Sequence, residues 1–139
     1  MRPDSVERIA ETGVIAILRG VSVEDAPDVA AAVTEGGVAA LEITADTPNV
    51  TAAIEAVADR VDAAVGVGTV LDAETARAAQ LAGAEFVVTP TVNRAVIRTA
   101  NRYGTPIAAG AYTPTEALDA FEAGADFVKV FPAKTGGPA

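Results

Sequence analysis

Two charged side chains lie in the middle of segments that are otherwise apolar. Lys129 is the central residue of "FVKVF" (127–131), and Glu42 lies in "VAALEIT" (38–44). A lysine without water contacts gives up its proton more readily, and the neutral amine can condense with a ketone to form a Schiff base. Glu42 is the best-placed group to move the protons that this reaction requires. The alternative interpretation is a packed lysine stem and a structural ion pair between the two residues.

Six short apolar runs alternate with longer alanine-rich stretches. We expect strands at 14–18, 38–44, 64–70, 86–90, 106–110 and 127–131. Capping residues predict the helix starts between them, and glycines predict the helix ends: Ser22, Thr47, Asp72, Asn93 and Thr113 for the starts, and Gly36, Gly83, Gly104 and Gly124 for the ends. Strands that alternate with helices in this way form a parallel α/β sheet with right-handed crossovers.

A weak internal repeat favours a barrel over an open sheet. The segments "EGGVAALEIT", "LAGAEFVVTP" and "EAGADFVKVF" share one pattern, and aligning their glycines places Glu42, Val88 and Lys129 at equivalent positions. Alternate strands of a (β/α)₈ barrel contribute to one interior layer, so Glu42 and Lys129 are expected together near the C-terminal strand ends. The rival architecture, a doubly wound sheet, lacks its G-x-G-x-x-G fingerprint here.

Composition narrows the classes of function. The 139 residues fit one domain, half of them are apolar, and there is no cysteine or histidine, so neither a metal site nor a cofactor is expected. The net charge of −9 disfavours nucleic acid and anionic membranes as partners. No membrane span or signal peptide is recognisable, which predicts a cytoplasmic protein. The abundant acid and scarce lysine also suit a high-salt cytoplasm, with ordinary acidic solubility as the alternative.

The ordered set of motifs resembles the 2-keto-3-deoxy-6-phosphogluconate (KDPG) aldolase family of class I aldolases, which are (β/α)₈ TIM barrels. The likeness runs from "GVIAILRG" to the C-terminus, through "GGVAALEIT", "VGVGTVLDAE" and "AGAEFVVTP" to "FVKVFPA", the most specific of them. By this resemblance, Lys129 is the Schiff-base lysine and Glu42 the general acid/base. Thr69 then lines the pyruvate site, and Phe131 and Pro132 form the wall beside the lysine. The resemblance also implies a homo-oligomer, commonly a trimer.

One departure from the family pattern concerns the substrate carboxylate. Some members bind it with an arginine shortly after the glutamate, where this sequence has Asp46. Other members, including the 2-keto-3-deoxy-6-phosphogalactonate aldolases, place the arginine after the first strand, as Arg19 in "ILRG". A guanidinium suits bidentate carboxylate binding, so Arg19 is the candidate here. The alternative is an arginine that only seals the end of the barrel.

The length is the second departure. A (β/α)₈ barrel takes about 200 residues or more, so residues 1–139 are expected to form a partial TIM-barrel domain without the last two strand–helix units. In this family the loops after those strands bind the substrate phosphate. Exposed sheet edges would promote association.

The resemblance leaves several functions open. The first is cleavage of KDPG, a keto-deoxy sugar acid phosphate, to pyruvate and glyceraldehyde 3-phosphate. The alternatives are the galactonate epimer as substrate, a catalytically silent barrel fragment, and, more weakly, another phosphate-binding barrel.

Overall fold

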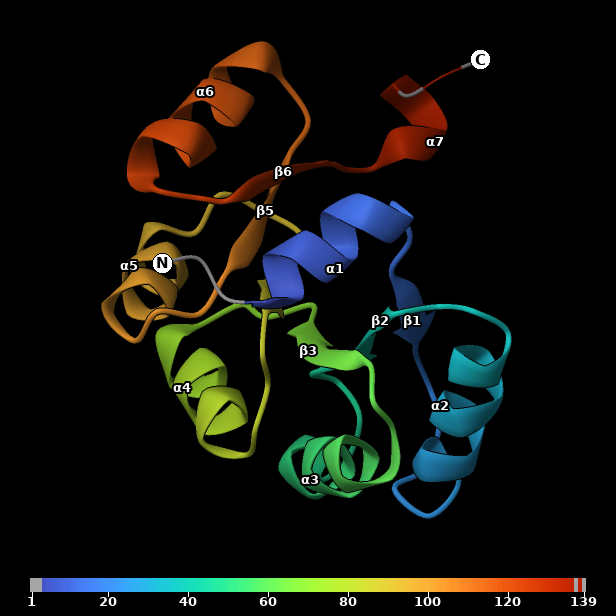
Figure 1. The fold of residues 1–139 in the computed structure, drawn as a ribbon. Coiled ribbons are helices and arrows are strands. Elements are labelled where there is room, and N and C mark those ends of the chain that lie inside the picture. The colour runs from blue at the N-terminus through green and yellow to red at the C-terminus, as the bar shows by residue number, and fades with distance from the viewer. Residues whose placement is uncertain (1–3, 137, 139) are drawn as a thin grey trace.

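Six parallel strands form one curved sheet in the computed structural model, which describes residues 4–136 and 138. They pair in chain order: β1 (Ala16–Leu18), β2 (Ala40–Thr44), β3 (Ala64–Gly68), β4 (Val87–Val88), β5 (Ile107–Ala111) and β6 (Phe127–Val130). A helix follows each of the first five: α2 (Ala26–Glu35), α3 (Val50–Arg60), α4 (Ala73–Leu81), α5 (Arg94–Arg102) and α6 (Pro114–Ala123). These five helices surround the outside of the sheet (Figure 1). The predicted TIM-barrel-type α/β fold is confirmed, with six strands among the described residues.

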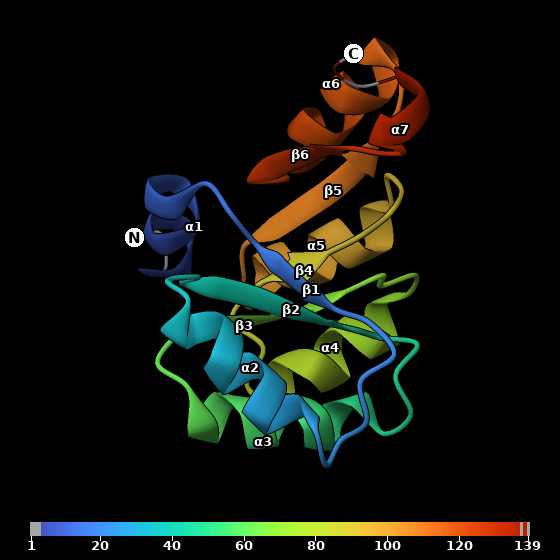
Figure 2. The same ribbon diagram turned by 90° about the vertical axis from the view of Figure 1, so that its right-hand side faces the viewer.

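The register of the strands separates the two faces of the sheet. Leu41 and Ile43 of β2 belong to the apolar core between the sheet and the outer helices. Figure 2 shows α2, α3 and α4 along the outer side of β1, β2 and β3. Ala40 belongs instead to a second cluster on the concave face. Since successive side chains alternate along a strand, Glu42 shares the concave face with Ala40. Lys129 pairs with Gly110 in register and lies between Phe127 and Phe131, and Phe127 packs against the concave cluster.

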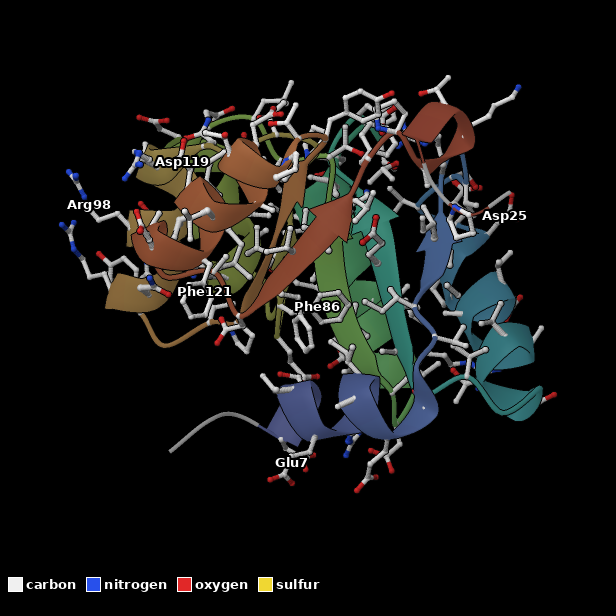
Figure 3. The ribbon with its side chains drawn as sticks, turned by 90° about the horizontal axis from the view of Figure 1, so that it is seen from above. Glu7, Asp25, Phe86, Arg98, Asp119 and Phe121 are labelled. Atoms are coloured by element: carbon white, nitrogen blue, oxygen red, sulfur yellow. The ribbon has the colours of Figure 1, made fainter. Side chains whose placement is uncertain are left out.

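One end of the concave face is closed by α1 (Asp4–Thr12). This helix lies across the ends at which the strands begin, as Figure 3 shows from above. Ile9 of α1 packs in the concave cluster with Phe86, and the Ser5 hydroxyl donates to the Glu85 carbonyl at 3.3 Å. A Cβ at Gly66 would overlap the Phe86 ring, so this glycine gives the ring its place against β3. The opposite end, where the strands finish, stays available for chemistry.

Three of the five predicted helix caps are confirmed. The side chains of Asp72, Asn93 and Thr113 accept hydrogen bonds from the first turn of α4, α5 and α6, and Glu116 completes a capping box with Thr113. Figure 3 shows α6, which carries Asp119 and Phe121, beside α5, which carries Arg98.

The other two start predictions are wrong. The Ser22 hydroxyl accepts from the Asp25 backbone in a turn that precedes α2, so the helix begins only at Ala26. Thr47 is followed by a turn, and Asn49, in a left-handed conformation, precedes α3.

The glycine predictions also need one correction. Gly83, Gly104 and Gly124 have the expected positive φ, but Gly36 has φ −73° and continues the right-handed turn. The left-handed residue after α2 is Gly37, at φ 100°. Glycine adopts this conformation without the steric cost that a side chain would add.

Strand β4 is shorter than the run at 86–90 predicted. The chain turns at Thr89, whose hydroxyl donates to the Thr91 carbonyl at 2.6 Å, and Pro90 has no N–H to continue a ladder. Gly110 of β5 lets this turn approach closely, because a Cβ there would overlap the Pro90 backbone.

The sheet is open between β1 and β6, because within the described residues each of these strands pairs on one side only. Ile17 on the concave face of β1 and Val130 on the convex face of β6 are both 56% exposed. After β6 comes α7 (Ala133–Gly136), a single helical turn. None of the helices in residues 4–136 has the length and apolar character needed to cross a bilayer.

We expect Phe86→Ala to lower the free energy of unfolding by about 3 kcal/mol, because its buried ring fills the concave cluster against Gly66. Urea denaturation followed by circular dichroism measures this change. Phe121→Ala is the matched control, since Phe121 is 70% exposed and its loss should cost less than about 0.5 kcal/mol. Equal losses in the two variants would contradict this account of the interior.

Candidate active site

A cavity of about 590 Å³ lies at the C-terminal ends of the strands, on the concave face. Seven side chains line it: Ile17, Arg19, Glu42, Thr69, Pro90, Lys129 and Phe131. Five of these are candidates from the sequence, and residues from both ends of the chain thus meet in one place. Pro132, the sixth candidate, is exposed and does not line the cavity.

Two lining residues were missed by the sequence analysis. Ile17 lies in the register position of β1 that pairs with Glu42, so it faces the same interior. Pro90 stands directly after β4, at the turn that Gly110 accommodates. The signal for Pro90 was its position at the end of "FVVTP", where a barrel strand delivers side chains to the site. Ile17 could have been found by extending the strand alternation to β1.

Lys129 reaches the cavity from β6, at the edge of the sheet. Its ammonium nitrogen lies 4.8 Å from the centroid of the Phe131 ring, close enough for a cation–π interaction. The side chain is half-buried, whereas its position within an apolar run predicted a lysine without water contacts. The reason is tertiary. Among the residues that the structure describes, β6 has a neighbour on one side only, so one flank of the lysine is open to water.

Glu42 is the buried charged group of the cavity, at 3% exposure. Burial raises the pKa of its carboxyl, and the positive charges of Lys129 and Arg19 partly oppose that shift. The carboxylate has room because Gly68, on the neighbouring strand β3, has no side chain; a Cβ there would overlap Glu42 Oε1. The ion pairs among the described residues do not include one between Glu42 and Lys129.

Arg19 lies at the rim of the cavity and makes two side-chain contacts. Its Nη1 donates to Asp46 Oδ2 at 3.2 Å, and its Nη2 donates to Thr69 Oγ1 at 2.9 Å. The side chains of Arg19 and Asp46 are 56% and 57% exposed, so this ion pair is well solvated. The pKa of Asp46 is lowered, first by the Thr44 hydroxyl and then by the charge of Arg19.

Thr69 has an unusual backbone for its residue type. Its φ of 56° is left-handed, which a β-branched residue adopts at a steric cost. It directly follows Gly68 at the end of β3, and the backbone N–H of Val70 then donates to the Val88 carbonyl at 3.2 Å. The strained turn places the Thr69 hydroxyl beside Arg19.

A family model described as "KDPG and KHG aldolase" matches residues 6–139 of this chain. The chain belongs to this aldolase family. The 2-dehydro-3-deoxy-6-phosphogalactonate aldolase of Escherichia coli is 40% identical over 126 residues, which are 89% of this chain and 62% of that protein. The 2-dehydro-3-deoxy-phosphogluconate aldolase of Treponema pallidum is 39% identical over 132 residues, 94% of this chain and 61% of the relative. The chain therefore spans about three fifths of the length of these curated relatives.

A solved structure agrees in fold. The KDPG aldolase of Legionella pneumophila, described with pyruvate captured as a covalent carbinolamine intermediate, has a TM-score of 0.81 at 28% identity, over 88% of this chain and 60% of that one. The similarity to solved members of the family thus extends over most of the six-stranded sheet.

Glu42→Gln should stabilise the chain at pH 8 by about 1 kcal/mol, because a buried carboxylate would be replaced by a neutral amide. The folded chain holds the Glu42 proton more tightly than the unfolded chain, since burial raises the pKa above its ordinary value of 4.5. The stability due to protonated Glu42 is thus complete below that value and is lost as pH rises through the raised one.

Urea denaturation of the parent chain and the variant at pH 4, 6 and 8 tests this. The gain from Glu42→Gln should grow with pH. Glu55→Gln, on the exposed face of α3, makes the same change of charge and should show no such trend. A gain that is equal at all three pH values would contradict the assigned burial effect.

Proposed function

We propose that this chain provides the reacting groups of a class I aldolase that cleaves KDPG to pyruvate and glyceraldehyde 3-phosphate. The observation that carries the proposal is the cavity in which Lys129 and the buried Glu42 meet without forming an ion pair in the described structure. A lysine held only by a structural ion pair would have its nitrogen on the carboxylate. Here the amine faces the cavity beside the Phe131 ring, where a ketone can reach it.

The proposed reaction begins at Lys129. Its neutral amine attacks the C2 ketone of the substrate, and loss of water from the carbinolamine gives an iminium. The C4 hydroxyl loses its proton and becomes the carbonyl of the departing aldehyde as the C3–C4 bond breaks, and the iminium takes up the electron pair of that bond to form an enamine. The resulting enamine takes a proton at C3, and water then releases pyruvate and the free lysine.

Glu42 is the proposed carrier of these protons. Its raised pKa brings the carboxyl nearer to neutral pH, where one group can both give and accept a proton. It would donate as the carbinolamine loses water, and accept from the C4 hydroxyl as the bond breaks. Burial supports this role because exchange with bulk water is limited at a carboxyl that is 3% exposed.

Arg19 is the proposed partner of the substrate carboxylate. Its guanidinium lines the same cavity as Lys129, and its planar array of N–H donors suits bidentate binding. Thr69 and Phe131 would form walls of the pyruvate site. Pro132 would act only by shaping the turn after Phe131, since it does not line the cavity.

A second candidate is the galactonate epimer of the same substrate. It is favoured by the position of the cavity's arginine after the first strand, where the sequence pattern places it in galactonate-type members. The E. coli relative named for the galactonate substrate and the T. pallidum relative named for the gluconate substrate are almost equally similar, so identity alone does not choose between them. The rate of pyruvate release from each epimer separates the two. A catalytically silent barrel fragment is the remaining alternative, and it is tested by trapping the Schiff base on Lys129 with borohydride.

Incubation with pyruvate and borohydride should give a covalent adduct on Lys129 alone, detected by mass spectrometry of the peptides. Lys129→Ala should abolish the adduct. Lys134→Ala is the matched control, because Lys134 is the other lysine of the chain and lies exposed in α7. An unlabelled parent chain, or labelling that follows Lys134, would refute the proposed nucleophile and favour a silent barrel fragment.

We further propose that the protein is a cytoplasmic homo-oligomer, a trimer by family resemblance, adapted to high salt. Apolar side chains at the open side of the sheet support association: Ile17, Val128, Val130 and Phe131 are each at least 36% exposed. The net charge of −9 opposes close approach of copies in dilute salt.

Assembly and melting temperature should both rise as KCl increases from about 0.1 M to about 1 M, because the Debye length falls from about 10 Å to about 3 Å and self-repulsion is screened. Light scattering and thermal unfolding at each concentration measure the two quantities. Sucrose serves as a control that stabilises compact states without screening charge. A monomer at every salt concentration, or a falling melting temperature, would contradict the proposal.

A further inference from the structure

We propose that Asp46 is a positioning residue, which together with Thr69 holds the Arg19 guanidinium at the rim of the Lys129 cavity so that it can receive a substrate carboxylate. This inference rests on the proposed function and assigns a role to a residue that carries a charge opposite to that of the arginine found there in some family members. Asp46 itself does not line the cavity.

The contacts of Arg19 define the arrangement. Asp46 Oδ2 accepts from Nη1, and Thr69 Oγ1 accepts from Nη2, so the two ends of the guanidinium fork are held by different strands. Asp46 follows β2 and Thr69 follows β3, while Arg19 follows β1. The guanidinium therefore bridges three successive strand ends, and its plane is fixed by two partners.

The Arg19 guanidinium keeps N–H donors that neither Asp46 nor Thr69 uses. A guanidinium has five N–H groups, and the two contacts take one at each terminal nitrogen, which leaves three for a ligand. Two of these can bind both oxygens of a carboxylate. A carboxylate of the protein thus orients the arginine without using all of its capacity.

A neighbouring cavity shows that Asp46 contacts Arg19 from the side away from the Lys129 cavity. A smaller cavity of about 210 Å³ lies beside the first, lined by Ala45, Asp46, Thr69, Leu71, Asp72 and Thr75. Thr69 lines both cavities. Arg19 faces the Lys129 cavity while Asp46 faces the smaller one, so Thr69 and the Arg19–Asp46 ion pair stand between the two. Without its anchors, the half-exposed arginine would be free to turn into solvent.

Asp46→Asn tests this role with little change of shape. The readout is the pyruvate concentration that gives half-maximal borohydride labelling of Lys129. We expect it to rise about three- to fivefold, the scale of an exposed ion pair, with the same final extent of labelling at saturating pyruvate. Asp28→Asn is the matched control, because it breaks the exposed Arg60–Asp28 pair at 3.7 Å in the outer helices and should leave the half-saturating concentration unchanged.

Two further measurements separate positioning from a general structural effect. Hydroxyacetone, a ketone without a carboxylate, should label the parent chain and Asp46→Asn at the same half-saturating concentration. In Arg19→Ala, added Asp46→Asn should have no further effect on pyruvate, because the group that Asp46 holds is gone.

The outcomes are distinct. An unchanged or lowered half-saturating pyruvate concentration in Asp46→Asn would overturn the inference, as would an equal weakening for hydroxyacetone, or full additivity with Arg19→Ala. If the parent chain shows no labelling of Lys129, the proposed function fails and the inference fails with it. If the parent chain is labelled and only the Asp46 effect is missing, the inference alone is overturned.

Discussion

Burial of the Glu42 carboxyl is the constraint around which the site is built. A carboxyl that is 3% exposed inside a sheet needs both space and a compensating field. Gly68 supplies the space, since any side chain there would overlap Glu42 Oε1. The positive charges of Lys129 and Arg19 lower the free-energy cost of ionising the Glu42 carboxyl. Neither residue forms an ion pair with this carboxylate in the described structure. The result is a carboxyl with a raised pKa that faces the same cavity as an amine.

The rest of the fold sets the boundaries of that cavity. The concave cluster of Phe86, Ile9 and their neighbours fills the end where the strands begin, and α1 covers it. Water and ligands can therefore approach from the other end, where the strands stop and the loops begin. Glycines at three places permit this packing: Gly66 accommodates the Phe86 ring, Gly68 the Glu42 carboxyl and Gly110 the turn at Pro90.

The open side of the sheet has consequences for Lys129. Because β6 pairs only with β5 in the described chain, Lys129 has a protein neighbour on one flank and water on the other. Its aromatic contact with Phe131 is partly exposed too, at 44% for that ring. The exposure of Lys129 therefore depends on what lies beside β6, and not on the residues of the strand alone.

The sequence by itself determined the alternation of strands and helices, the faces of the strands and the identity of the main charged residues. These follow from local rules. Alternation in "AALEIT" puts Glu42 and Leu41 on opposite faces of the strand. Capping by Asp72, Asn93 and Thr113 depends on neighbours within three residues. The helix starts near Ser22 and Thr47 could not be placed in the same way, because those side chains belong to turns that lead into the helices.

Only the tertiary structure decided how the charged groups meet. The half-exposure of Lys129 depends on the edge position of β6, which pairs with β5 alone within residues 4–136. The contacts of Arg19 with Asp46 and Thr69 depend on three strand ends lying side by side. These partners are 27 and 50 residues away from Arg19 in sequence. Their spacing follows no local period, because parallel strands are brought into register by the helices that cross between them.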